Sequence, residues 1–217
     1  MAIHEMNLTH LKWRGSYVSK WKAIIKCAAW KGNLSILKWD KDNEASQWED
    51  NVSQVLYSPW NEAAKGGHME VLKWLREHGR CPWDETCENA VDGGHLDILK
   101  WSRQNNCPWD RWSWNYAAEN GHLEVLQWSR QNNCPWGEWT CARAASNSHL
   151  EVLQWAGKNN CPWDADVCTF SASNGHLEVL QWARQNNCPW DERTFKNAAR
   201  NGHLEVVRRA RENGYPN

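Results

Sequence analysis

The chain has 217 residues with nearly balanced charge, 25 Lys and Arg against 26 Asp and Glu, and it contains 19 tryptophans. This balance argues against a protein that binds nucleic acid or membranes over its whole surface. The sequence has no run of 18 apolar residues and no apolar core of a secretory signal near its start, so we expect no membrane span and a cytoplasmic location.

The first predicted elements are a capping segment and an incomplete copy of a recurring motif. Residues 1–22 are expected to form a helix or turn that closes the array, and CAAWKGNLSILKW at 27–39 is the first copy. Residues 40–52, DKDNEASQWEDNV, form an acidic polar insertion with Trp48 as its expected anchor. Because residues 1–39 are basic, we expect the insertion to fold back on the first copy. The alternatives are a docking surface for an acidic partner or nucleic acid, and a solvated surface without a partner.

From residue 68 onward a 27-residue period governs the sequence. Histidines recur with this spacing, and CPW triplets recur at 26 and then 27 residues. The first copy has Asn33 in the histidine position, so the chain holds seven copies. A fixed period of this size predicts a solenoid, in which each copy covers the apolar face of its neighbour. The histidines are His68, His95, His122, His149, His176 and His203, and the triplets begin at Cys81, Cys107, Cys134, Cys161 and Cys188.

Each copy is predicted to contain two short helices, as the last copy illustrates. Asp191 is an expected N-cap, and Pro189 keeps the residues before it out of a helix. The Asn-Gly pair at 201–202 ends the first helix, and the second begins near His203 with apolar residues at helical spacing. We expect one recurring tryptophan in the core of the second helix and the other at the CPW corner, both buried between copies.

The cysteines and histidines are interpreted as structural residues. Stacked repeats lie roughly 8–10 Å apart, whereas a disulfide requires Cα atoms within about 7 Å, so equivalent cysteines of neighbouring copies should not pair. The five corner cysteines are therefore expected to be reduced and buried, in a reducing compartment. The histidines are one repeat apart, too far to share a metal ion, and are expected to hydrogen-bond the loop that ends a first helix.

The copy from Gly137 to Asn160 departs from the pattern three times. Gly137 replaces the Asp N-cap, Ser148 replaces the helix-ending glycine, and Gly157 replaces a helical arginine. Each change should cost roughly 0.5–1 kcal/mol. We therefore expect this copy to open first.

The recurring segment AAENGHLEVLQW resembles the ankyrin repeat, in which Ala-Ala, two variable residues and Gly-His precede an apolar second helix. The resemblance covers about residues 23–214, and residues 203–217 would form the C-terminal capping helix and tail. The period is 27 residues rather than about 33, and an NNCPWD corner replaces the β-hairpin finger. The segment looks like the shortened, tryptophan-rich ankyrin-like repeat of large DNA viruses and protists.

This resemblance implies an all-α solenoid of about seven stacked helix-turn-helix repeats without β-hairpin fingers. Ankyrin arrays are protein-binding scaffolds without catalytic residues, so it implies another protein as partner, no cofactor and no metal, and a chain that is monomeric by itself. No GxSxG, P-loop, HExxH or paired-carboxylate motif appears in the sequence. The alternative function is a structural or assembly component of a larger particle such as a virion, which rests on the usual sources of this repeat.

The first helices vary between copies while the second helices scarcely do, which favours the concave first-helix face as the binding surface. The residues 2, 6 and 9 positions after the N-cap Asp of a copy lie on one side of its first helix, and we call these positions offsets 2, 6 and 9. From the first copies to the last, the residues at these offsets change from acidic through aromatic to basic. Trp, Tyr and Arg dominate binding hot spots. The alternative is that offset 6 belongs to the packed core. The candidate partner-binding residues are Trp112, Tyr116, Trp139, Arg143, Asp166, Phe170 and Arg193.

Overall fold

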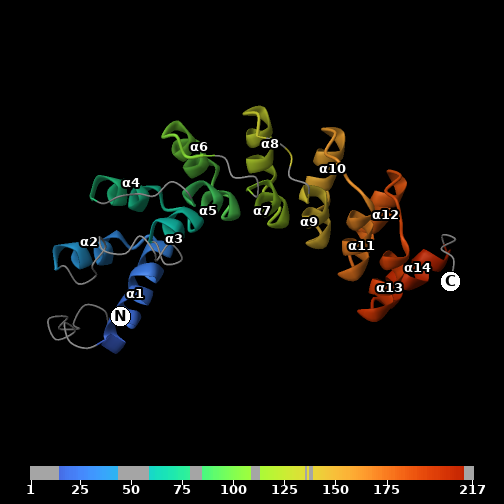
Figure 1. Cartoon of the computed structure of the whole chain (residues 1–217), viewed down its shortest axis with the longest axis horizontal. Helices are drawn as coiled ribbons and strands as arrows, with labels where there is room; N and C mark the ends of the chain where they lie inside the picture. Colours follow the sequence, from blue (N-terminus) through green and yellow to red (C-terminus); the bar gives the residue numbers. More distant parts are fainter. Residues whose placement is uncertain are drawn as a thin grey trace. The chain divides into compact units, whose positions relative to one another are not determined.

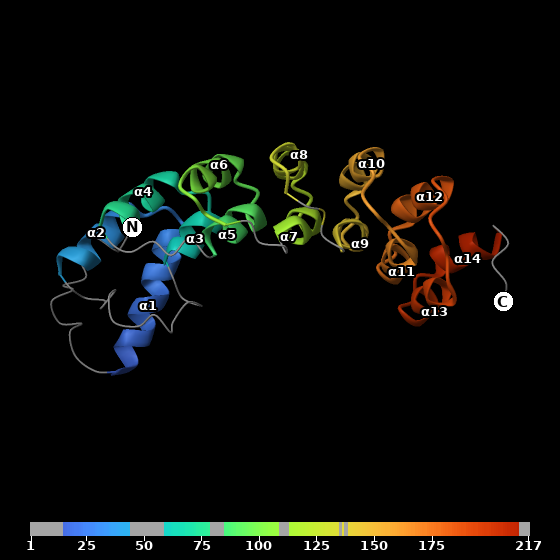
Figure 2. The ribbon, with the colours of Figure 1, turned by 45° about the horizontal axis from the view of Figure 1, so that its top comes forward.

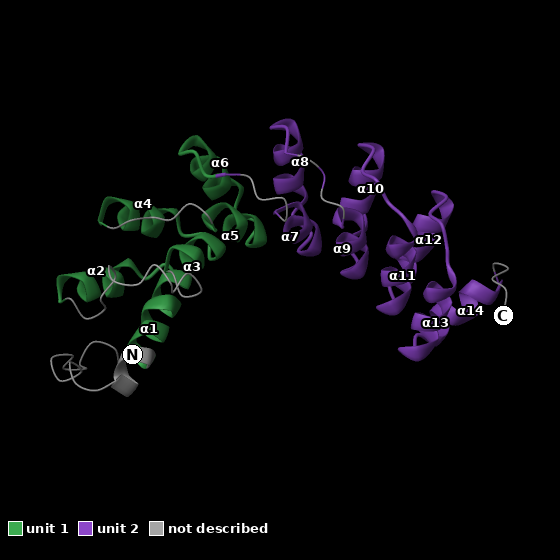
Figure 3. Cartoon of the chain, viewed as in Figure 1, with its two compact units in different colours: residues 1–107 green, residues 108–217 purple. Residues whose placement is uncertain are grey.

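The residues described by the computed structural model form fourteen α-helices and no strand, so the predicted all-α class is confirmed (Figure 1 and Figure 2). The chain divides into two compact units, unit 1 covering residues 1–107 and unit 2 covering residues 108–217 (Figure 3). In the described part of the chain, no helix has both the length and the apolar composition needed to cross a membrane. The described residues are 15–43, 59–78, 85–108, 113–134, 136 and 139–212.

Unit 1 is built from helix pairs. Each odd-numbered helix, which we call the first helix of a copy, contacts the even-numbered second helix that follows it. The first helices α1, α3 and α5 also contact one another in sequence. The helices described in unit 1 are α1 (Gly15–Trp30), α2 (Leu34–Asp42), α3 (Pro59–Lys65), α4 (Met69–His78), α5 (Thr86–Asp92) and α6 (Leu96–Gln104).

Unit 2 has the same construction, with the first helices α7, α9, α11 and α13 in contact as a row and each paired with the second helix that follows it (Figure 2). Its helices are α7 (Ser113–Glu119), α8 (Leu123–Gln131), α9 (Thr140–Ser146), α10 (Leu150–Lys158), α11 (Ala165–Ser173), α12 (Leu177–Gln185), α13 (Glu192–Arg200) and α14 (Leu204–Glu212).

A glycine in the left-handed region ends the first helix, as the Asn-Gly signal predicts. Gly121 and Gly202 have φ angles of +74° and +77°. The next amide, that of His122, donates to the carbonyl of Ala117 at 2.8 Å, which closes the helix and turns the chain back. Ala117 and Ala118 are buried, and the buried valine and leucine side chains of the second helices complete the core.

The second helices end on an asparagine, which explains the letters NNC at each corner. The second asparagine of each described corner has a φ angle between +56° and +65°. The cysteine after it donates its amide to a carbonyl five residues earlier, as Cys161 does to Ala156 at 3.0 Å. Asparagine adopts this left-handed conformation more readily than most residues do. The asparagines are Asn106, Asn133, Asn160 and Asn187.

The recurring histidine connects neighbouring copies. The Nε2 of His149 donates to the carbonyl of Glu119 at 2.9 Å, and that of His176 donates to the carbonyl of Ser146 at 2.9 Å. Both acceptors end the first helix of the preceding copy. The predicted hydrogen bond to the end of a first helix is therefore present, and it crosses from one copy to the next.

The two recurring tryptophan series are less buried than predicted. The described corner and second-helix indoles are all half-buried, whereas Trp114 of the first helix α7 is fully buried. The corner ring packs against the ring of the second helix that follows it in the chain, with centroids 5.3 Å apart for Trp163 and Trp182 and 5.4 Å apart for Trp136 and Trp155. The planes of the two rings are inclined by 67° and 56° respectively, so the rings meet edge-on or tilted at half-buried positions.

Two predicted boundaries differ from the observed helices. Helix α1 runs continuously past residue 22, where the predicted capping segment 1–22 ends. Helix α2 continues to Asp42, so the start of the predicted insertion 40–52 is helical. The remainder of that insertion, including Trp48, lies outside the described residues. At the other end, α14 provides the helix predicted within residues 203–217.

The prediction that the corner cysteines are reduced is wrong for Cys107, which forms a disulfide with Cys87. Cys87 is not the equivalent cysteine of a neighbouring copy but a residue of α5, 20 positions earlier, with a Cα–Cα distance of 6.3 Å. Cys81 lies outside the described residues. The other corner cysteines are buried thiols, as predicted: Cys134, Cys161 and Cys188.

Candidate functional site

The predicted partner-binding residues fall on the row of first helices in unit 2. Tyr116, Arg143 and Phe170 occupy equivalent positions in α7, α9 and α11. Asp166 and Arg193 occupy an equivalent position in the first turns of α11 and α13. Because these helices contact one another in order, the residues lie along one row rather than at scattered places.

The aromatic residues of this row lie at its surface and not in the packed core. Tyr116 and Phe170 are half-buried, whereas Cys141 and Cys168, which occupy the first-helix position two residues earlier in the repeat, are 2% and 0% exposed. The buried side of each first helix is therefore a different side from the one that carries Tyr116 and Phe170. Tyr116 and Phe170 stand at offset 6, the position for which the alternative prediction was a place in the packed core. Because both side chains are only half-buried, that alternative does not describe them.

Trp139 is the exposed aromatic residue of the row, with 40% of its surface accessible. It is the N-cap of α9, which begins at Thr140. The sequence prediction placed the N-cap of this helix at residue 137, two residues earlier. An indole cannot accept the hydrogen bond that an N-cap side chain usually accepts, and Trp139 makes no such bond. Its ring is therefore placed at the start of the helix without a capping role. Trp112, one repeat earlier, lies outside the described residues and stays a prediction.

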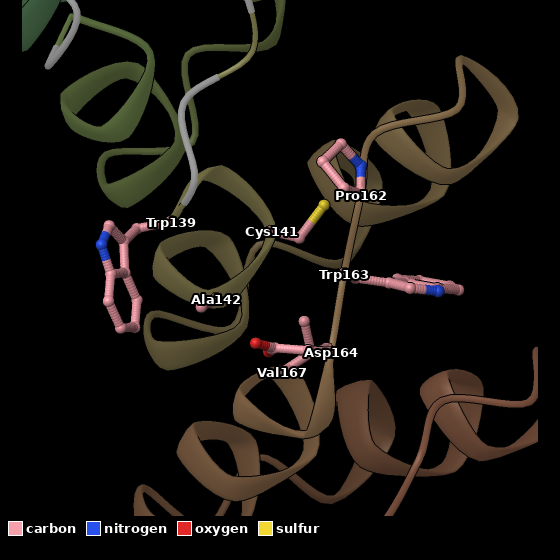
Figure 4. Close-up of a pocket in the computed structure, with 7 residues that line it drawn as sticks. All are labelled: Trp139, Cys141, Ala142, Pro162, Trp163, Asp164 and Val167. Atoms are coloured by element: carbon pink, nitrogen blue, oxygen red, sulfur yellow. The ribbon is translucent and has the colours of Figure 1, made fainter.

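A pocket of about 180 Å³ adjoins Trp139, between α9 and the corner that leads into α11 (Figure 4). The apolar side chains of Pro162, Trp163 and Val167 form much of its lining. The thiol of Cys141 points toward Pro162, and Asp164 and Val167 approach from the start of α11 (Figure 4). The pocket is thus formed by two neighbouring copies and has one carboxylate, that of Asp164, among its lining residues.

Ion pairs connect the charged residues of the row to neighbouring copies. Arg143 lies 3.5 Å from Glu119 of α7, and Arg193 lies 2.9 Å from Asp166 of α11. The side chain of Asp166 is 14% exposed, so it is largely covered, whereas those of Arg143 and Arg193 are 53% and 59% exposed. Surface ion pairs of this kind contribute at most about 1 kcal/mol to stability. Their main effect here is to hold two guanidinium groups at fixed places along the row.

Arg193 also contacts Asp191, the N-cap of α13, at 2.6 Å. Burial raises the pKa of the Asp191 carboxyl, but hydrogen bonds from Arg193, from the Thr194 amide and from the Thr169 hydroxyl outweigh it and leave that pKa below its ordinary value. Asp191 is therefore a carboxylate at neutral pH, and it positions Arg193 at the start of its helix.

The described residues offer no group of three or more His, Cys, Asp or Glu side chains that could hold a metal ion. Five of the recurring histidines donate a hydrogen bond from Nε2 to a backbone carbonyl of the preceding copy. They are His68, His95, His149, His176 and His203. Each of these hydrogen bonds therefore joins one copy to the copy before it.

No protein-family model matches the chain, and no curated protein is significantly similar to it. The functional interpretation therefore depends on the residues and their geometry.

Sequence reasoning missed two features of this region. The pocket residues Pro162, Asp164 and Val167 were not singled out, because the corner and the neighbouring first helix meet only in three dimensions. The pairing of first-helix with corner cysteines was also missed. A signal for it existed in the sequence, since cysteines recur 20 residues apart at 87 and 107, at 141 and 161, and at 168 and 188.

Proposed function

We propose that this chain is an ankyrin-like solenoid of seven helix pairs and a non-catalytic scaffold that binds another protein through the first-helix row of unit 2. The observation that supports it best is Trp139, an indole that is 40% exposed beside a pocket of about 180 Å³. A monomeric protein gains little from placing so large an apolar side chain in water, whereas tryptophan is enriched at the centre of protein interfaces.

The neighbouring residues support the same interpretation. Tyr116 and Phe170 offer half-buried rings on either side of α9, and Arg143 and Arg193 offer guanidinium groups already oriented by carboxylates. Side chains that are held in place before binding lose less conformational entropy when a partner docks. We expect the partner to place an apolar side chain in the pocket and carboxylates near the two arginines.

Comparative capture tests this proposal. Immobilised wild-type chain, Trp139→Ala and Trp30→Ala are incubated with extract of the native cell, and the retained proteins are quantified by mass spectrometry. Trp30 is the matched control, because it is 49% exposed but lies at the end of α1 in unit 1. We expect a partner whose recovery falls at least about tenfold on Trp139→Ala, as for a hot-spot residue, and is unchanged on Trp30→Ala.

Equal recovery of every retained protein on all three baits would show that the site is misplaced. Trp139→Ala should remain folded and lose about 0.5–3 kcal/mol in free energy of unfolding, because the side chain is only partly exposed. This measurement separates loss of binding from loss of structure.

A further inference from the structure

Three copies carry a cysteine at two fixed positions, one inside the first helix and one at the corner after the second helix. In one of them, Cys87 of α5 and Cys107 after α6 form a disulfide. The same two positions are occupied by Cys141 and Cys161 around α9 and α10, and by Cys168 and Cys188 around α11 and α12. The separation is 20 residues in every case.

The backbone around the corner cysteine is the same in all three copies. Cys107, Cys161 and Cys188 each follow an asparagine in the left-handed region. Their amides donate to the carbonyl five residues earlier at 3.0, 3.0 and 2.9 Å respectively. A disulfide that fits one of these corners therefore meets the same backbone at the other two.

The helix and corner of one remaining pair are in contact. The thiol of Cys168 donates to the carbonyl of Cys188 at 4.0 Å. The Cys188 thiol is further placed by the carbonyl of Asp164, 3.4 Å away.

The copy formed by α7 and α8, which precedes α9 in the chain, shows what a different residue does at the first-helix position. Trp114 of α7 stands there, and its Nε1 donates to the sulfur of Cys134 at 2.6 Å. The indole occupies the space that the second thiol fills in the other copies. This copy is a natural control for cysteine chemistry that depends on a pair.

We propose that Cys141 with Cys161, and Cys168 with Cys188, are modification sites that form disulfides equivalent to Cys87–Cys107 when the chain meets a low-molecular-weight disulfide such as glutathione disulfide. One cysteine thiolate attacks the small disulfide and releases one small thiol, leaving a mixed disulfide on the protein. The second cysteine then attacks the protein sulfur of that mixed disulfide and releases the second small thiol. Two protein thiols are oxidised, one small disulfide is reduced, and the two thiol protons pass to the released thiols.

The two pairs differ in accessibility. Cys141 lines the pocket beside Trp139, and Cys161 is 6% exposed, whereas Cys168 and Cys188 are both 0% exposed. Oxidation of Cys141 with Cys161 should therefore precede that of Cys168 with Cys188, which requires a local opening of its copy.

The test uses the full chain in native buffer. The reduced protein is incubated with glutathione disulfide, its remaining thiols are alkylated, and unreduced peptides are mapped by mass spectrometry. Trypsin alone leaves Cys161 and Cys168 on one peptide, so a protease that cuts at aspartate and glutamate is added. We expect cross-links 87–107, 141–161 and 168–188, in which 141–161 forms before 168–188.

Matched variants locate the effect. Cys161→Ala should remove the 141–161 cross-link and leave 168–188 intact, while Cys134→Ala should leave both. The melting temperature of the oxidised wild type should exceed that of the reduced chain, and the difference should shrink in Cys161→Ala. Recovery of Cys141, Cys161, Cys168 and Cys188 as alkylated thiols, or cross-links between equivalent corners such as 161–188, would overturn the proposal. Mapping on the wild type alone decides between these outcomes, whether or not a variant folds.

Discussion

The imidazole of His149 lies directly against Gly121 of the preceding copy, so that a Cβ atom built on this glycine would be 2.5 Å from Nδ1 of the ring. Gly121 also has a φ angle of +74°, which few residues with a side chain adopt. The glycine thus ends its own first helix and leaves space for the histidine of the next copy. Each Gly-His pair in the repeat serves the joint between copies as well as the turn within one.

Gly121→Ala should therefore lower the free energy of unfolding of unit 2 for two reasons, the left-handed backbone conformation and the contact with His149. The left-handed conformation costs an alanine about 1–2 kcal/mol, and the contact with the His149 ring should add about 1–3 kcal/mol as overpacking. The free energy of unfolding from chemical denaturation measures the sum.

Gly202→Ala is the matched control, because Gly202 has nearly the same φ angle, +77°, and no atom within 4 Å of a built Cβ. Its cost should be the conformational part alone. Equal losses for Gly121→Ala and Gly202→Ala would contradict the packing of His149 on Gly121.

Ser148→Gly should stabilise the chain, because Ser148 holds a φ angle of +64° at the position where most copies have glycine. Removing the side chain relieves the left-handed strain of about 1–2 kcal/mol, and the greater freedom of glycine in the unfolded chain offsets roughly 0.5–1 kcal/mol of it. We expect a net gain of about 0.5–1 kcal/mol in the free energy of unfolding. Ser148→Ala retains the Cβ atom, and a similar gain in that variant would argue against strain as the cause.

Gly157→Ala in α10 should also stabilise the chain. In other copies an arginine at this position covers the corner indole, with Arg130 5.1 Å from the Trp136 ring and Arg184 4.9 Å from the Trp190 ring. A Cβ built on Gly157 meets Trp182 and Trp163 at ordinary contact distances of 3.6 and 3.7 Å, so alanine fits. The expected gain in the free energy of unfolding is about 0.5–1 kcal/mol.

Gly157→Arg should add about 0.5–1 kcal/mol to that gain if the guanidinium stacks on Trp163 as its counterparts do. The same unfolding experiment compares the two variants. A Gly157→Arg variant no more stable than Gly157→Ala would show that the arginine contributes nothing beyond its Cβ and helical propensity.

The helical framework was predictable because its signals are local. The Asn-Gly pair and the apolar spacing of the second helix each act within a few residues, and the 27-residue period of His149 and its equivalents repeats these local signals. The hydrogen bond from His149 to Glu119 joins residues 30 positions apart, and no spacing rule identifies a particular carbonyl. The half-burial of Trp163 and Trp182 was missed for a related reason, since sequence shows that rings recur but not which ring faces which.

The candidate site was predictable as a face but not as a pocket. The stripe count placed Tyr116 and Arg143 on one side of the first helices, where they lie. It also assumed a uniform helix start, and α9 begins at Thr140 instead, which places Trp139 before the helix at the N-cap position rather than within its first turn. Cys87 and Cys107 were overlooked because only equivalent positions of neighbouring copies were compared, whereas the disulfide joins two different positions of one copy.

The pair α9–α10 should open before the neighbouring internal pair α11–α12, because it contains both Ser148 in the left-handed region and Gly157 within a helix. Each local defect lowers the free energy of opening of its own copy, and hydrogen exchange detects such openings copy by copy. Amides of 140–158 should therefore exchange faster than those of 165–185 in mass-spectrometric measurements. The double variant Ser148→Gly with Gly157→Ala should slow exchange in 140–158 while leaving 165–185 nearly unchanged. Slower exchange in α9–α10 than in α11–α12 of the wild type would rule out this account of where the array is weakest.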